Sequence, residues 1–510
     1  MSSIFLILIL IYAILYLILA IRKLDWAVML LIIALPSYLI RFKILGIPFT
    51  LLEAMILISF TVWVIANRRQ LIANIRQLGK AKQIGEQKIK YPFRWEIVLM
   101  LIISYGAMAV AGFSSSAMGI WKAYFFEPVL VFILVLNVFK NNTPSDTEAL
   151  AGKNNANDTP ARKASLAIAG GRMTRINMNK IFWAFSISAL AVSALAIYQK
   201  FTGAWIPNEF WAAPETRRVT SFFGYPNAVG LYLAPLVMLF IGWLAEQTRL
   251  YQQEIMKNFK LVMQIIFSLI VILASILAIY FAHSDGALIA LIVALLIFGI
   301  LANRKLRAVT LSIFVVICVA VFYFQIININ IINKITLTDL SGQIRRVQWQ
   351  ETWQMLRDGR IIFGSGLANY QEEIEQYHTS GFYLKSDDPE YEKMIKISLE
   401  YQQLYWQPLE IYLYPHNIIL NFWTEIGLAG MLLFVWIIVK FMGIGVKRYL
   451  GENIEDRYLV LGLICAMLAI VVHGLVDVPY FKNDLSVMFW IMITIMSLIN
   501  LKFKNSMNNK

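Results

Sequence analysis

Long apolar runs constrain this chain most, because about 20 consecutive apolar residues form a helix that crosses the hydrocarbon core of a bilayer. Thirteen such runs occur in the sequence, at 3–21, 25–40, 46–66, 96–113, 121–139, 181–199, 226–245, 261–282, 286–302, 308–327, 417–439, 458–477 and 485–501. The run 25–40 is short and contains Pro36, so the count is 12 or 13. The sequence predicts an all-α membrane protein, a polytopic bundle of about 12–13 transmembrane helices with one large extracytoplasmic loop.

The composition agrees with lipid as the solvent of this fold. Hydrophobic residues make up 59% and charged residues 15% of the 510 positions, whereas soluble domains carry about 25% charge. The net charge of +14 comes from basic residues in short segments between apolar runs, which excludes a nucleic-acid partner. Cys318 and Cys465 lie inside apolar runs and are interpreted as core residues. The first run is interpreted as a retained helix, because no positive residue precedes it.

Lys and Arg residues set the expected orientation of the bundle. With the N-terminus outside, 30 of the 45 Lys and Arg residues fall in inner segments. Eight of the other 15 lie in the long loop, and long loops are exempt from the positive-inside rule. We therefore expect a multi-pass protein of a cytoplasmic (inner) membrane, with the C-terminus inside.

Three regions follow from this topology. Residues 1–327 hold the first ten helices, with cytoplasmic loops at 67–95 and 140–180; residues 328–416 form the large extracytoplasmic loop; residues 417–510 hold the last three helices and a cytoplasmic tail. The segment 67–95 is basic and is expected to lie against anionic lipid headgroups. The segment 140–180 is rich in Asn, Asp, Thr, Gly and Ala, which predicts a disordered loop.

The large loop opens with a candidate amphipathic helix. Its expected apolar face combines Ile344, Val347, Trp353 and Leu356, and Gly359 is the expected stop. The middle of the loop, 371–410, is acidic and aromatic.

Ionisable residues inside membrane helices are costly and therefore indicate function. In the expected topology, such residues fall in the outer halves of their helices at Glu53, Glu127, Glu425 and Asp477. The four histidines also lie on or near the outer side, at His283, His378, His416 and His473. This distribution predicts a working site at the outer membrane face. The alternative is that these charges only pair with Lys and Arg at the interface.

An enzyme at the outer face has no nucleotide sugars, so its donor must carry its own activation, as a lipid diphosphate does. That leaving group needs cations, and the outer loops supply two arginine pairs, Arg217 with Arg218 and Arg345 with Arg346. The acceptor hydroxyl needs a base, for which His416, at the end of the large loop, is suited. No metal and no cofactor are expected, because an HExxH motif, paired cysteine ligands and a dense carboxylate cluster are all missing from the sequence. His283 with Asp285, and His473 with Asp477, remain as weak pairs that could hold a cation.

Several motifs resemble the O-antigen ligase and O-antigen polymerase superfamily. The stretch from Arg217 to Asn227, RRVTSFFGYPN, is similar to the family's outer-loop signature. The most specific segment is Pro415-His416-Asn417, followed by nine residues, Gly427, two residues and Gly430. The turn FGSGL (363–367), the segment HGLVD (473–477) and the segment KAYFFEP (122–128) also resemble family segments, so the likeness extends from about 100 to 500.

The resemblance implies a metal-independent, inverting glycosyltransferase. It implies that His416 activates the acceptor hydroxyl and that Arg217 or Arg218, with Arg345 or Arg346, holds the diphosphate of an undecaprenyl-linked glycan. Supporting polar roles are expected for Asn417, Glu425, His473, Asp477 and Glu127. One departure is the stretch Ser284-Asp285-Gly286, where many members of the family have Ser-Arg-Gly.

The expected function is therefore an O-antigen ligase-like transfer of a glycan from undecaprenyl diphosphate to a lipid, glycan or protein acceptor, as in lipopolysaccharide assembly or pilin glycosylation. A polysaccharide polymerase of the same fold is the first alternative. A transporter of lipid-linked glycans or solutes is the alternative of another class; it would place polar residues near the bilayer midplane, often in repeated halves. The sequence has no evident repeat.

Overall fold

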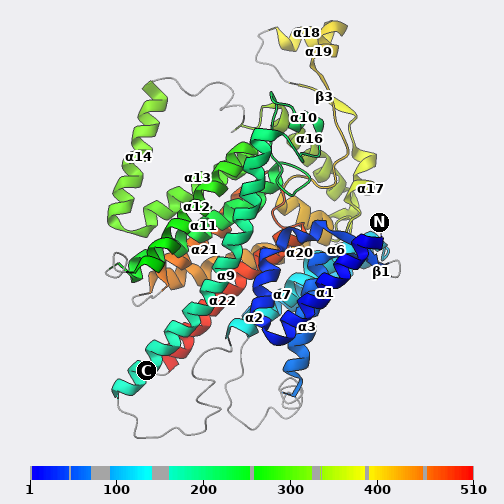
Figure 1. Ribbon diagram of the computed structural model, residues 1–510. Helices are drawn as coiled ribbons and strands as arrows, with labels where there is room; N and C mark the ends of the chain where they lie inside the picture. The colour runs from blue at the N-terminus through cyan, green and yellow to red at the C-terminus, as the bar shows by residue number, and fades with distance from the viewer. Residues whose placement is uncertain are drawn as a thin grey trace.

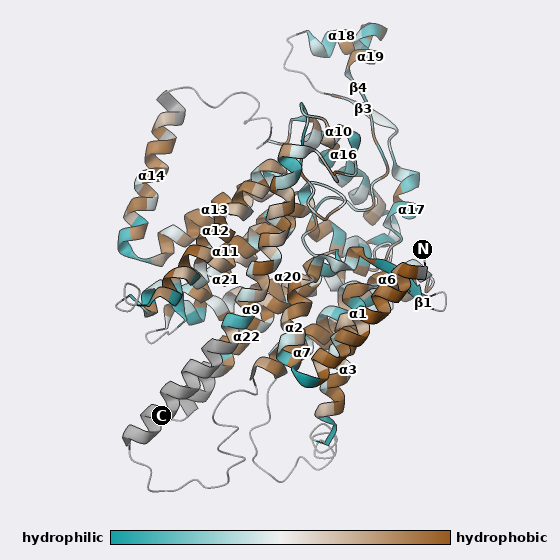
Figure 2. Ribbon diagram, viewed as in Figure 1, coloured by the Kyte–Doolittle hydropathy of each residue, from teal (hydrophilic) through white to brown (hydrophobic). Residues whose placement is uncertain are grey.

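The protein is a helical bundle with a cap of loop elements at one end, seen in a computed structural model (Figure 1). The structure describes residues 3–44, 47–69, 92–140, 160–252, 258–323, 334, 336–384, 390–451 and 456–508. Apolar residues cover the long helices, and polar residues gather in the cap (Figure 2). The predicted all-α polytopic membrane fold is confirmed.

Each of the thirteen predicted apolar runs corresponds to a helical segment. Within the described ranges, nine segments are long and apolar enough to cross a membrane. They lie in α1 (Ser3–Arg22), the continuous α6 (Ser115–Trp121), η2 (Lys122–Phe126) and α7 (Glu127–Lys140), α9 (Pro160–Thr202), α11 (Asn227–Leu250), α12 (Phe259–Phe281), α13 (Asp285–Ala302), α20 (Ile418–Leu450), α21 (Arg457–Gly474) and α22 (Asn483–Asn508). The remaining runs correspond to α2 (Leu24–Ile33) with η1 (Leu35–Leu39), α3 (Leu51–Ala66), α5 (Arg94–Val110) and α14 (Arg304–Tyr323). The weak run 25–40 is thus divided into α2 and the short η1 helix, which has Pro36 in its first turn.

Helices α11 and α21 form the centre of the bundle, and their contact depends on glycine. A Cβ atom placed on Gly242 of α11 would lie 2.5 Å from the Cα of Gly462 in α21. Small residues of this kind let helix backbones approach closely in lipid, where packing has to hold helices together. Helix α22 is buried along most of its apolar length. The end of the bundle that carries the cap therefore rests on three well-packed helices.

The prediction of a disordered loop at 140–180 is wrong for the second half of that segment. Helix α9 begins at Pro160, inside that segment, and continues for 43 residues to Thr202. Proline is favoured in the first turn of a helix, and the residues that follow are mostly Ala, Arg, Lys, Leu, Met and Ile. These helix formers outweigh Gly170 and Gly171, which suggested a loop. Residues 141–159, and residues 70–91 of the other predicted cytoplasmic loop, lie outside the described residues.

The cap is built mainly from the large loop (Figure 1). Its elements are α16 (Leu340–Met355), η4 (Leu356–Arg360), α17 (Tyr370–Ile374), η5 (Glu375–Tyr377), β3 (Gly381–Tyr383), α18 (Tyr391–Ile397), α19 (Leu399–Tyr405) and β4 (Trp406–Pro408). Strands β3 and β4 pair antiparallel, as do β1 (Arg41–Ile44) and β2 (Ile47–Thr50). The short helix α10 (Glu209–Ala212) also lies in this cap.

The predicted amphipathic helix exists as α16 with η4, but it buries a different face. Trp353, on the predicted apolar face, is 44% exposed, and Ile344 and Val347 are only partly covered; of that face, Leu356 alone is fully buried. The buried side is largely polar and consists of Gln343, Gln348, Glu351, Thr352 and Met355. Buried polar side chains require partners, and those partners are in the candidate site and in the loop behind it. Hydrophobic periodicity therefore located the helix and missed its orientation. The predicted stop is in place, because Gly359 has a φ of +82°.

Candidate functional site

Three motifs that lie far apart in the sequence converge on the turn 475–477, which follows α21. The side-chain amide of Asn417 donates to the Leu475 carbonyl over 3.0 Å, and Arg345 Nε donates to the Val476 carbonyl over 3.0 Å. The Asn227 amide donates to Asp477 Oδ2 over 3.1 Å. This turn, the HGLVD segment of the sequence, therefore fixes α11, α16 and α20 relative to one another at the end of the bundle that carries the cap.

Arg218 joins this cluster through Asn227. Its Nη2 donates to Asn227 Oδ1 over 3.2 Å and to the His283 carbonyl over 3.1 Å, and its Nε donates to the Ala282 carbonyl over 3.1 Å. The guanidinium thus bridges the end of α12 and the start of α11. Burial lowers the pKa of Arg218, Asp285 opposes that shift, and the positive charge of Arg345 adds to it. The two arginines therefore share one electrostatic environment that favours an anion.

His416 lies at the junction of the large loop and α20. Asn417 caps the helix by accepting from the amides of Ile419 and Leu420 over 3.0 and 3.1 Å. His416 itself has a φ of +46°, a backbone conformation that is rare for a residue with a side chain. Its Nδ1 lies 3.1 Å from Oε1 of Gln348. Because the amide oxygen accepts, Nδ1 carries the proton, and Nε2 has its lone pair available for a substrate proton.

Two tyrosines flank the His416 ring, and charges nearby tune it. The ring centroids of Tyr412 and Tyr414 lie 5.2 and 4.8 Å from that of His416. Burial lowers the pKa of His416, Asp477 opposes the shift, and Arg345 adds to it. A lowered pKa keeps the imidazole neutral near pH 7, which is the form a general base requires.

The two other predicted arginines face away from this cluster. Arg217 Nε donates to the Ala212 carbonyl over 3.1 Å, and its Nη1 donates to the Lys200 carbonyl over 3.1 Å, so it closes the loop after α9. Arg346 donates to the Thr336 carbonyl before α16. Neighbouring residues on a helix or loop point in different directions, so each pair contributes one arginine to the cluster.

The predicted supporting residues divide into two groups. His473 is buried one turn before the cluster, where a Cβ on Gly286 would lie 2.8 Å from its ring. Glu127, at the start of α7, accepts from the amide of Asn483, the neighbour of Lys482, over 2.8 Å. Glu425 accepts from the Ala368 amide over 2.8 Å, which makes it a support of the loop.

A glycine turn anchors the large loop to a break in α20. Gly427 has a φ of +72° and interrupts the helix, and the amide of the next residue donates to the Ile362 carbonyl over 3.0 Å. Ser365 donates its amide to the Thr424 carbonyl over 2.7 Å. A Cβ on Gly364 would lie 2.3 Å from that same carbonyl oxygen, so a larger residue does not fit.

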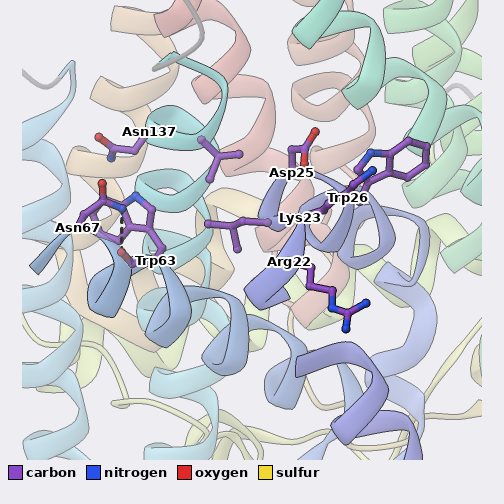
Figure 3. A pocket seen from close by; sticks show the side chains of 9 residues that line it. Arg22, Lys23, Asp25, Trp26, Trp63, Asn67 and Asn137 are labelled. Atoms are coloured by element: carbon purple, nitrogen blue, oxygen red, sulfur yellow. Dashed lines mark hydrogen bonds between the residues drawn. The ribbon is translucent and has the colours of Figure 1, made fainter. Parts of the chain in front are cut away.

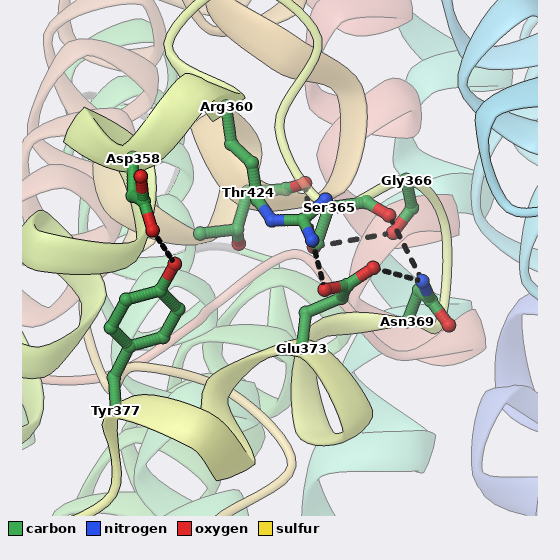
Figure 4. Close-up of polar contacts among 8 residues, drawn as sticks. All are labelled: Asp358, Arg360, Ser365, Gly366, Asn369, Glu373, Tyr377 and Thr424. Atoms are coloured by element: carbon green, nitrogen blue, oxygen red, sulfur yellow. Dashed lines mark hydrogen bonds and ion pairs between the residues drawn. The ribbon is translucent and has the colours of Figure 1, made fainter.

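A polar network beside the turn holds it in place, as Figure 4 shows. Arg360 pairs with Glu373, Asn369 donates to both Glu373 and the Ser365 carbonyl, and Tyr377 donates to Asp358. The FGSGL segment (363–367), called the glycine clasp below, therefore attaches the loop that carries His416 to α20.

Sequence reasoning missed two residues of the cluster. One is Gln348, whose side chain contacts His416; it was missed because it lies on the polar face of α16. Lys482 lies before α22 with its ammonium 3.9 Å from the ring centroid of Tyr225, and the Tyr414 hydroxyl donates to that of Tyr225 over 3.4 Å. Burial lowers the pKa of Lys482 to about 8, against the opposing charges of Asp484 and Asp477. A lysine in a short outer segment between two apolar runs was the signal that could have identified it.

The weak cation pairs of the sequence have other partners. Asp285 forms an ion pair with Lys334 over 2.8 Å, and Asp477 receives the Asn227 amide. In the described part of the chain, no group of three or more His, Cys, Asp or Glu residues is arranged to hold a metal ion. The arrangement instead offers three cations and a neutral imidazole around one turn.

The comparisons with known proteins agree with the motifs. A family model described as O-antigen ligase matches residues 269–435, which run from α12 through the large loop to the first half of α20. The match includes Arg345, Gln348, His416 and the glycine clasp. A search of curated proteins finds no match. Residues 269–435 are thus similar to the O-antigen ligase family, and this match confirms the resemblance predicted from the sequence.

Proposed function

We propose that this protein transfers a glycan from an undecaprenyl diphosphate carrier to an acceptor hydroxyl at the extracytoplasmic face of a bacterial cytoplasmic membrane. The observation that carries the proposal is the convergence of Arg218, Arg345 and His416 around the turn 475–477. Arginines and an imidazole are the groups needed to hold a diphosphate and to deprotonate a hydroxyl.

The diphosphate would be held by cations. Arg218 and Arg345 would bind its oxygens, and Lys482 would supply the positive charge that the family's Ser-Arg-Gly arginine supplies elsewhere. The positive charge of Arg345 lowers the pKa of both Arg218 and His416. The negative charge of Asp477 acts in the opposite direction on the pKa of both His416 and Lys482. The cations and His416 are therefore close enough to interact electrostatically. Fixed positive charge in a partly dry site stabilises a leaving diphosphate without a metal ion.

The transfer step would be a single displacement. The acceptor oxygen forms a bond to the anomeric carbon while the bond from that carbon to the diphosphate oxygen breaks. Nε2 of His416 takes the hydroxyl proton, and the electron pair of the broken bond leaves on undecaprenyl diphosphate. Attack opposite the leaving group inverts the anomeric configuration. Gln348 keeps Nδ1 protonated throughout and thus presents Nε2 to the acceptor.

Ligase and polymerase differ only in the acceptor, which is a lipid or protein for a ligase and a second lipid-linked glycan for a polymerase. The His-Asn spacing favours the ligase. A transporter is disfavoured because its polar groups belong near the membrane midplane, whereas this cluster lies at helix ends: Asn227 begins α11 and Asn417 precedes α20.

The test is acceptor-dependent release of undecaprenyl diphosphate. Purified protein in detergent with EDTA is given an undecaprenyl diphosphate oligosaccharide, either alone or with lipid, glycan and protein acceptors. We expect release of the carrier together with one class of glycosylated product, and the productive acceptor separates ligase from polymerase. Binding of the donor without release, whichever acceptor is offered, would contradict the proposal and favour a transporter.

A further inference from the structure

A cavity lies at the end of the bundle opposite the candidate site. It has a volume of about 520 Å³ and lies between the α1–α2 junction, the end of α3 and the end of α7. Figure 3 shows Trp63, Asn67 and Asn137 on one side of it, and Asp25 and Trp26 on the other. Pockets that bind small ligands have about 300–1,000 Å³, so the space suits a headgroup-sized molecule.

Helix geometry separates this cavity from the outer end. Asn67 follows Glu53 by 14 residues along α3 and beyond its last turn, a distance of about 21 Å at 1.5 Å per residue. Helix α7 shows the same separation. Its start at Glu127 lies near the ion pair of Glu53 with Lys122, whose atoms are 2.6 Å apart, whereas the cavity residue Asn137 lies near its end. The cavity is therefore independent of the His416 cluster. In the expected topology it opens toward the cytoplasm.

The lining of the cavity is basic. Arg22 and Lys23 join α1 to α2, are exposed, and form no ion pair with any residue that the structure describes. The lining's acidic residue, Asp25, is neutralised by Lys180 of α9. Two cations thus remain available for an anion beside the indoles of Trp26 and Trp63.

The surroundings of the cavity are suited to lipid chains. Residues on the outer surface of α1 that leads to Arg22 are exposed and apolar, including Ile14, Leu15, Ile18 and Ile21. Trp26, which is 51% exposed, lies at the helix end, where tryptophan is favoured at the lipid headgroup level. Basic pockets between membrane helices on the cytoplasmic side bind anionic headgroups.

From these observations we propose that this cavity binds the phosphate headgroup of an anionic phospholipid, with Arg22 and Lys23 on the phosphate and the acyl chains along α1. The bound lipid would fasten the α1–α2 junction to the ends of α3 and α7. This role is separate from glycan transfer and does not depend on the proposed function.

The test is lipid retention by the whole protein. Wild type and the double variant Arg22→Gln/Lys23→Gln are reconstituted in nanodiscs of phosphatidylcholine with or without phosphatidylglycerol, and lipid retained after extraction is measured by native mass spectrometry. The matched control is Arg304→Gln/Lys305→Gln, an exposed Arg-Lys pair at the start of α14. Because each cation near an anionic headgroup contributes about 1 kcal/mol, we expect about thirtyfold weaker retention of phosphatidylglycerol in the first variant. The control should retain it as wild type does.

Two results would overturn the proposal. One is equal retention of phosphatidylglycerol by wild type and the Arg22/Lys23 variant, or equal retention of both lipids by wild type. The other is thermal stabilisation of wild type by inorganic phosphate as strong as that by the lipid, which would identify a soluble phosphate as the ligand. Thermal melting of the Arg22→Gln/Lys23→Gln variant in phosphatidylcholine alone, unchanged from wild type, confirms that the variant is folded.

Discussion

The two adjacent arginines of the RRVTSFFGYPN segment offer a sharp test of the site. Arg218 is bonded to Asn227 and to the end of α12, whereas Arg217 is bonded to the loop after α9. Replacing each in turn with glutamine removes one positive charge at almost the same place in the sequence. Only Arg218→Gln should impair transfer strongly.

The structural cost of the two changes is nearly equal. Each guanidinium donates three hydrogen bonds within the protein: Arg217 to the carbonyls of residues 200, 201 and 212, and Arg218 to those of residues 282 and 283 and to the Asn227 side chain. At about 1 kcal/mol for each bond, either variant loses up to about 3 kcal/mol of stability. The catalytic cost differs, because removing one group that stabilises a developing charge lowers kcat about 10²–10³-fold.

The assay is initial-rate glycan transfer at several donor concentrations, with thermal melting of both variants alongside. We expect similar decreases in Tm, a loss of about a hundredfold in kcat/KM for Arg218→Gln, and a change within about threefold for Arg217→Gln. Equal losses of transfer in the two variants would refute the assignment of Arg218 to the diphosphate. So would a greater loss for Arg217→Gln.

Three further predictions follow from the same geometry. Because the pKa of His416 is lowered, the rate of transfer should persist below pH 6.5 and fall as the pH drops through that pKa. Since Arg345 contributes to the lowering, Arg345→Gln should move this acid limb of the pH–rate profile to higher pH. Lys482→Gln should raise the KM for the donor about tenfold or more, measured by donor titration, whereas Lys482→Arg should restore part of the loss; an unchanged KM would remove this residue from the site. Gly364→Ala should lower the Tm by several degrees, whereas Gly443→Ala, which meets no atom within 4 Å, should not.

The fold was largely predictable because the lipid bilayer imposes a length and a composition on each helix. All thirteen apolar runs correspond to helical segments, including the one divided at Pro36. The run 181–199 predicted the second half of α9, but its first half, from Pro160, was not predicted, since helix propensity outside the membrane competes with loop composition and the sequence does not decide between them. The orientation of α16 was wrong because its buried side is polar, and hydropathy recognises only apolar faces.

The residues that meet at the candidate site were partly predictable from the motifs, and their functional roles stay predictions. His416, Asn417 and Asp477 are in the cluster that the motifs suggested, but the choice between Arg217 and Arg218 depends on side-chain direction, which adjacent residues do not share. Gln348 could not be found because a glutamine on a helix has no distinctive pattern in a sequence. Its role comes from a contact with a residue 68 positions away.

The most direct test of the central claim is glycan transfer by His416→Ala, measured with EDTA present and compared with wild type and His378→Ala. His378 is a matched control, because it is a loop histidine whose ring contacts the Leu409 carbonyl and Glu351, outside the cluster. We predict that wild type and His378→Ala transfer the glycan in EDTA, and that His416→Ala, correctly folded by thermal melting, loses transfer by about 10²-fold or more. Transfer at the wild-type rate by His416→Ala would contradict the account and leave the cluster without its base.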